Sequence, residues 1–269
     1  YLRRHSIRNW RDMRSKSAVM AFIAVGGAAA TGGTGTNWYD IANAINVAIL
    51  LSLFSYSREM ESEADAYGLN LMQQAHYPPE AAAQVWRQLI DERKASAVAR
   101  KKRYSDKSRS VVSTHPPSDE RMADLSQSAA EIERSDAKAV PYDDRRAQWL
   151  QAVAPMRSML LDEQIKLNDP GASLYLLNSL AQDGWDATLR YHEGETYRLR
   201  DEEGDGARAA EAFASAIQYA DAPAEAFRAH GYAQLKAGKT EEGRRALTHY
   251  LELRPDAADA AIVRFSLGQ

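Results

Sequence analysis

The predicted fold follows from one segment near the carboxy terminus, Gly231-Tyr-Ala-Gln-Leu-Lys-Ala-Gly-Lys-Thr-Glu-Glu-Gly-Arg-Arg-Ala-Leu-Thr-His-Tyr-Leu-Glu-Leu-Arg-Pro255. Its small and apolar positions recur 34 residues earlier, where Ala209 and Phe213 stand in place of Gly243 and Leu247. Recurrence at one fixed period of this length is typical of helix pairs stacked in series. The segment therefore predicts a repeated helical architecture.

Further copies lie upstream of this segment. Gly194 and Tyr197 occupy first-helix positions if the following turn holds about three extra residues. A more degenerate pair is expected over residues 147–184. The pattern resembles that of tetratricopeptide repeats, although Gly243 stands where the repeat usually has Ala. This resemblance implies a helical solenoid over residues 147–269, whose concave face binds peptides or other proteins.

A second informative segment is Ser57-Arg-Glu-Met-Glu-Ser-Glu-Ala-Asp-Ala-Tyr-Gly68, which has helical periodicity. Glu61 and Asp65 are four residues apart, so they share one face of that helix. Carboxylate pairs at this spacing usually lie on solvated helix faces, so this pair alone does not define a site. The segment is followed by Ser113-Thr-His-Pro-Pro-Ser-Asp-Glu-Arg121, in which Ser118 is expected to begin another helix.

Together these two segments resemble the HtpX and BepA-like zinc metalloendopeptidases, relatives of the CAAX prenyl protease. The resemblance implies that Glu61 is a zinc ligand and that Asp65 orients a ligand imidazole through a hydrogen bond. Arg58 would support these ligands, and Gly68 would allow the helix to approach a neighbour closely. His115 would either stabilise the oxyanion or occupy the open position of the zinc.

The implied zinc site lacks two of its ligands in this sequence. Members of the resembled family supply two His ligands and a Glu general base from an HExxH helix, and no HExxH occurs between Tyr1 and Gln269. We expect that motif immediately before Tyr1, and we expect the chain as given to be unable to hydrolyse peptides. A zinc site formed by Glu61, His115 and one further group is the alternative.

Composition narrows the remaining possibilities. The 269 residues contain 34 Lys and Arg against 37 Asp and Glu, and no Cys. Disulfides and Cys-type zinc sites are thereby excluded, and a net charge of −3 gives no general attraction for nucleic acid. The basic run Arg93–Arg109 is interpreted as a solvated loop after Val98, and not as a nucleic-acid site.

Two apolar stretches, residues 18–30 and 41–54, are shorter than the roughly 20 residues that span a bilayer. They predict a helical hairpin that is buried against protein or, as the alternative, lies at a membrane surface. We expect an all-α chain with the carboxy-terminal part of a metalloprotease domain over residues 1–135, a linker over 136–146 and a repeat domain over 147–269.

Three functions are consistent with this organisation. The first is a bacterial zinc metalloendopeptidase that acts on protein substrates in envelope quality control, with repeats that recruit substrate or a partner. The resemblance places such a protein in the periplasm or at the inner surface of the outer membrane. The second is a tetratricopeptide adaptor whose protease half is degenerate, and the third is a membrane-bound scaffold.

Overall fold

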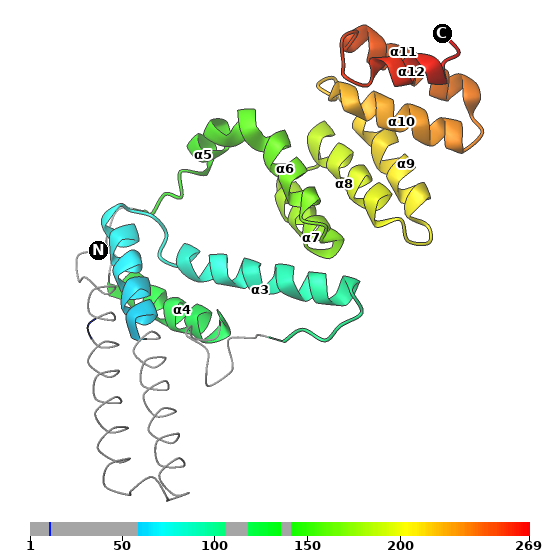
Figure 1. The fold of residues 1–269 in the computed structure, drawn as a ribbon. Helices are drawn as coiled ribbons and strands as arrows, with labels where there is room; N and C mark the ends of the chain where they lie inside the picture. Colours follow the sequence, from blue (N-terminus) through cyan, green and yellow to red (C-terminus); the bar gives the residue numbers. More distant parts are fainter. Residues whose placement is uncertain (1–10, 12–58, 106–117, 136–140) are drawn as a thin grey trace, which may run out of the picture. The chain divides into compact units, whose positions relative to one another are not determined.

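The computed structural model describes Arg11 and residues 59–105, 118–135 and 141–269 (Figure 1). Every regular element in this described part is helical, so the predicted all-α fold is confirmed. None of the described helices is long and apolar enough to cross a membrane. The apolar stretches 18–30 and 41–54 lie outside the described residues.

The chain forms two compact units. The amino-terminal unit comprises Tyr1–Ile90 and Ser105–Arg146, and the carboxy-terminal unit comprises Asp91–Tyr104 and Ala147–Gln269. Helix α3 contributes its first half to one unit and its second half to the other. The domain limits proposed from the sequence stay predictions.

The amino-terminal unit is built from a helix over residues 59–74, from α3 (Ala81–Ala99) and from α4 (Ser118–Ser135). Leu69, Ala83 and Leu125, one from each helix, form its buried core, and Trp86, Met122 and Ile132 pack around them. Because one apolar face of each helix points into this cluster, the opposite faces carry the polar residues. This packing sets the helix over residues 59–74 against α4.

Helix α3 ends within one residue of the position predicted from the sequence. The basic run from Arg93 was expected to leave helical structure after Val98, and the helix ends at Ala99. Tertiary packing in the carboxy-terminal unit explains its last turns. A Cβ added to Gly171 would lie 2.7 Å from the Ala99 side chain, so α3 and α7 are in close contact. The Ser96 hydroxyl also donates a hydrogen bond of 2.6 Å to Asp169.

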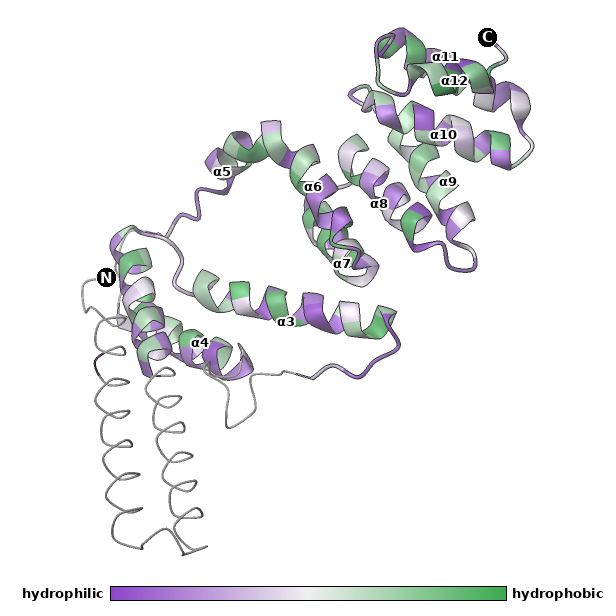
Figure 2. Cartoon of the chain, in the orientation of Figure 1, coloured by the Kyte–Doolittle hydropathy of each residue, from purple (hydrophilic) through white to green (hydrophobic). Residues whose placement is uncertain are grey.

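The carboxy-terminal unit continues through a series of short helices. They are α5 (Arg146–Val153), η2 (Ala154–Met156), α6 (Arg157–Lys166), α7 (Pro170–Leu180), η3 (Ala181–Asp183), α8 (Ala187–Arg200), α9 (Asp205–Ala216), α10 (Ala224–Lys236), α11 (Thr240–Leu253) and α12 (Ala260–Ser266). Helix α8 packs on α9, α9 on α10, and α10 on α11. Hydrophobic and hydrophilic residues alternate along these helices, as expected for amphipathic helices packed on one another (Figure 2).

The packing itself recurs along this unit. Ala229 and Ala233 of α10 pack against the core of α8 and α9, and the residues 34 positions later, Val263 and Leu267, pack in the corresponding core of α10 and α11. A Cβ added to Gly231 would lie 2.7 Å from the Leu247 side chain, and so α10 and α11 approach closely. The same arrangement therefore repeats at the period read from the sequence.

A buried carboxylate fixes the turn between α8 and α9. Asp205 is fully buried and accepts hydrogen bonds from Arg200 at 2.6 and 2.7 Å. Arg208 and the backbone N–H of Glu202 donate two more, at 2.9 and 3.0 Å. These bonds, that of Arg200 first, outweigh the effect of desolvation and hold the pKa of Asp205 well below its usual range.

We expect Asp205→Asn to lower the free energy of unfolding of the carboxy-terminal unit by about 1–2 kcal/mol at neutral pH, because charge-assisted hydrogen bonds are lost. The pKa of Asp205 is lower in the folded than in the unfolded chain, so its contribution is complete above the unfolded value of about 3.9. The contribution is lost as the pH falls through the lower folded value. Urea unfolding at neutral and acid pH measures the difference, and Asp201→Asn at the exposed end of α8 is the control. An equal loss in that control would contradict the assignment.

Candidate functional site

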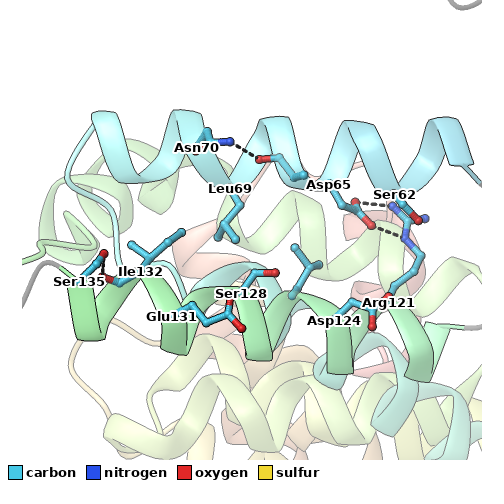
Figure 3. A pocket seen from close by; sticks show the side chains of 12 residues that line it. Ser62, Asp65, Leu69, Asn70, Arg121, Asp124, Ser128, Glu131, Ile132 and Ser135 are labelled. Carbon is cyan, nitrogen blue, oxygen red and sulfur yellow. Dashed lines mark hydrogen bonds and ion pairs between the residues drawn. The ribbon is translucent and has the colours of Figure 1, made fainter.

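The helix over residues 59–74 presents Glu61 and Asp65 to α4, where Arg121 binds both. The Arg121 guanidinium donates from Nε to Asp65 Oδ2 at 2.7 Å and from Nη2 to Asp65 Oδ1 at 2.5 Å (Figure 3). Its third nitrogen, Nη1, lies 2.9 Å from Glu61 Oε2. We call Glu61, Asp65 and Arg121 the carboxylate cluster.

The carboxylate cluster is largely shielded from water. The side chain of Arg121 is 13% exposed, while those of Asp65 and Glu61 are 20% and 30% exposed. Burial alone would lower the pKa of Arg121, but the hydrogen bonds and charges of Asp65 and Glu61 outweigh it and raise that pKa above its usual value. Arg121 therefore stays charged, and the cluster carries two negative charges against one positive charge.

Trp86 of α3 covers one face of the Arg121 guanidinium. The guanidinium carbon lies 4.1 Å from the centroid of the indole ring, within the range of a cation–π interaction. Trp86 packs in turn against the core that contains Leu69 and Leu125. The plane of the guanidinium is thus fixed by an aromatic face and its edges by two carboxylates, which orients both carboxylates at once.

A groove of about 400 Å³ runs from the carboxylate cluster between the helix over residues 59–74 and α4. Figure 3 shows Asp65 facing Arg121 at one end, with Asn70 and Ser135 at the other, so the two helices run in the same direction. Asp124 and Glu131 line the groove from α4. The carboxylate cluster therefore lies at one end of this open groove, where a bound chain could reach it.

The structure brings together two of the residues singled out from the sequence, Glu61 and Asp65. Arg58 and His115 lie outside the described residues, so their roles stay predictions. A Cβ added to Gly68 would meet no described atom within 4 Å. The close helix approach expected at Gly68 is therefore not made by a described neighbour, and it too stays a prediction.

A zinc ion needs three protein ligands in a catalytic site of the expected type. Among the described residues, no group of three or more His, Asp or Glu side chains is arranged to hold a metal ion. Glu61 offers carboxylate oxygen, which is a suitable zinc donor, and the carboxylate cluster orients it. The described residues thus supply one ligand that suits zinc, the Glu61 carboxylate. The other ligands would come from outside the described residues.

Sequence reasoning did not assign a role to Arg121 or to Trp86. Arg121 is 56 positions from Asp65 in the sequence, so helical periodicity cannot connect the two. The sequence offered one signal for Arg121: it lies on the helix that follows His115, in a segment that the family resemblance had already singled out. Trp86 could not be singled out from the sequence, because periodicity does not distinguish a core aromatic from one that covers a charged group.

Comparison with known proteins relates the amino-terminal part of the chain to metallopeptidases. Residues 1–129 match the model of peptidase family M48, and the match covers slightly less than half of the chain. Peptidases of this family are generally zinc-dependent. A comparison with curated proteins gave no match. The matched residues include Glu61, Asp65, Trp86 and Arg121.

Proposed function

We propose that this chain is part of a zinc-dependent metalloendopeptidase of the HtpX and BepA-like type that acts on protein substrates. The match of residues 1–129 to peptidase family M48 supports a metalloprotease-type function. One observation carries the proposal: the Arg121 guanidinium binds both Glu61 and Asp65. It thereby orients two carboxylates that lie on the same helix face. Solvated carboxylate pairs on a helix have no such common partner.

In this proposal Glu61 is the carboxylate ligand, and Asp65 and Arg121 are positioning residues. When bound, zinc lowers the pKa of a coordinated water toward about 7 and polarises the substrate carbonyl. Arg121 restrains Glu61 through Nη1 and Asp65 through Nε and Nη2. The two His ligands would come from an HExxH helix of the kind that the resembled family carries, and His115 would act as an oxyanion stabiliser or as a latch.

Glu61→Gln in the natural protein is expected to weaken zinc binding at least tenfold, because changes to zinc ligands and their partners cost about 10–100-fold. Glu59→Gln is the matched control, since Glu59 is an exposed glutamate on the same helix. Zinc affinity measured by competition with a chromogenic chelator gives the comparison, and cleavage of an unfolded protein substrate gives the second readout. Equal affinities for the two variants would remove Glu61 from the metal site.

The repeated helices of residues 147–269 are proposed to be tetratricopeptide repeats that recruit a substrate or a protein partner. Their support is the packing that recurs every 34 residues and a cavity of about 600 Å³ lined by α8, α9 and α10. A periplasmic location, alone or at the outer membrane, belongs to the same proposal. If proteolysis does not depend on Glu61 and partner binding survives its replacement, the adaptor function is favoured instead.

A further inference from the structure

The groove beside the carboxylate cluster has an apolar base. Leu69 and Leu125 are buried beneath it, at 3% and 6% exposure, and Ala66 and Ile132 complete the base. Asn70 Nδ2 and Ser135 Oγ, at the far end, donate to backbone carbonyls of their own helices at 3.0 and 2.7 Å. The base can therefore accept an apolar side chain without leaving these polar groups unpaired.

The rim of the groove is negatively charged. Asp124 and Glu131 are exposed on α4, and Asp124 forms no ion pair with a described residue. Glu131 accepts a hydrogen bond of 3.1 Å from Gln127, a neutral donor that leaves its charge uncompensated. Among the described residues that line the groove, Arg121 is the one cation, and Glu61 and Asp65 already share its charge. The groove thus presents uncompensated carboxylates above an apolar base.

The spacing of these two carboxylates fits an extended chain. Asp124 and Glu131 are two helical turns apart on the same face of α4, about 10 Å along the helix axis. A segment in the extended polyproline II conformation rises about 3.1 Å per residue with three residues per turn, so residues three positions apart lie on one face about 9 Å apart. Two basic side chains three positions apart could therefore pair with Asp124 and Glu131, while an apolar side chain between them reaches the base.

We propose that this groove binds an extended protein segment in which a large apolar residue lies between Lys or Arg residues. The inference rests on the proposed peptidase function, for which it names the class of substrate segment. Charge complementarity selects a basic segment over an acidic one, and the apolar base supplies contact area. Because Asp65 lines the groove, a segment bound there passes directly beside the carboxylate cluster.

The probe is a short fluorescent peptide with one leucine between two lysines three positions apart, and its counterpart has glutamates in place of the lysines. Fluorescence anisotropy with the 269-residue chain is expected to show binding of the basic peptide and at least about tenfold weaker binding of the acidic one. Added salt should weaken the binding, because exposed ion pairs are screened. Equal binding of the two peptides, or binding of neither, would overturn the proposal.

Variants on α4 locate the binding. Asp124→Asn with Glu131→Gln is expected to weaken binding of the basic peptide about fivefold. Glu120→Gln with Glu133→Gln removes the same charge from exposed positions of α4 outside the groove, and it should change the affinity by less than about twofold. Equal losses in the two double variants would show a nonspecific charge effect and contradict the groove.

Two further variants help to distinguish a failure of the groove proposal from a failure of the proposed peptidase function. Ser128→Trp places a large side chain in the groove from an exposed helix position, and it should abolish binding while the circular dichroism spectrum is unchanged. Glu59→Gln should leave peptide binding unchanged, since Glu59 is exposed on the helix over residues 59–74 and does not line the groove. If zinc binding depends on Glu61 and the basic peptide does not bind, the groove proposal fails while the peptidase proposal stands.

Discussion

Replacing Arg121 with methionine is expected to lower the local stability of the amino-terminal unit by about 2–4 kcal/mol, because two shielded carboxylates lose their shared counterion. The expected loss of stability is smaller than for a fully buried ion pair, because Glu61 and Asp65 are 30% and 20% exposed. Methionine retains most of the apolar contact with Trp86, so the loss reports mainly the charge. Native-state amide exchange in α4 and in residues 59–74 measures this local free energy without requiring the two units to unfold together.

Two companion variants test the physical cause. Arg121→Lys keeps the charge but loses the planar fork that binds both carboxylates, so about half of the loss should remain. Combining Arg121→Met with Glu61→Gln and Asp65→Asn removes every charge of the carboxylate cluster and should restore most of the stability. A loss in that combined variant as large as in Arg121→Met alone would show that packing, and not charge, determines the effect.

Gly243→Val is expected to destabilise the carboxy-terminal unit by about 2–3 kcal/mol, through overpacking between α10 and α11. A Cβ at Gly243 would lie 2.8 Å from the backbone oxygen of Gly231 and 2.7 Å from the Leu235 side chain. A backbone oxygen cannot rotate away as a side chain can, so the two helices would have to separate. Urea unfolding followed by circular dichroism should show the loss in the transition of this unit.

Gly206→Val is the control for the Gly243 variant. Gly206 is also helical, but a Cβ there would meet no described atom within 4 Å. Its replacement should change the free energy of unfolding by no more than about 0.5 kcal/mol, as is usual for a surface position. Similar losses at both positions would mean that a valine side chain on a helix of this unit, and not the contact with Gly231, governs the effect.

The candidate site was only partly predictable. Periodicity placed Glu61 and Asp65 on one helix face, because four residues make about one helical turn. Their common partner was not predictable, since Arg121 reaches them only when α4 packs against their helix. The same holds for Trp86, which packs in the core and covers Arg121 at once.

At the end of α3, the helix boundary was predictable from the sequence, but the packing was not. Local composition predicted a polar loop after Val98, and the helix ends at Ala99. Gly171 permits the close contact that packs this part of α3 on α7. The contact between α3 and α7 was not predictable, because it joins residues far apart in the sequence.

The sequence by itself determined the helical class, the 34-residue recurrence of apolar positions and the pairing of two carboxylates on one helix face. Each depends on local periodicity, which a single chain displays directly. The tertiary structure decided which cation joins those carboxylates, what covers it and why Gly243 must be small. Those facts depend on contacts between residues far apart in sequence, and such contacts exist only once the helices have packed.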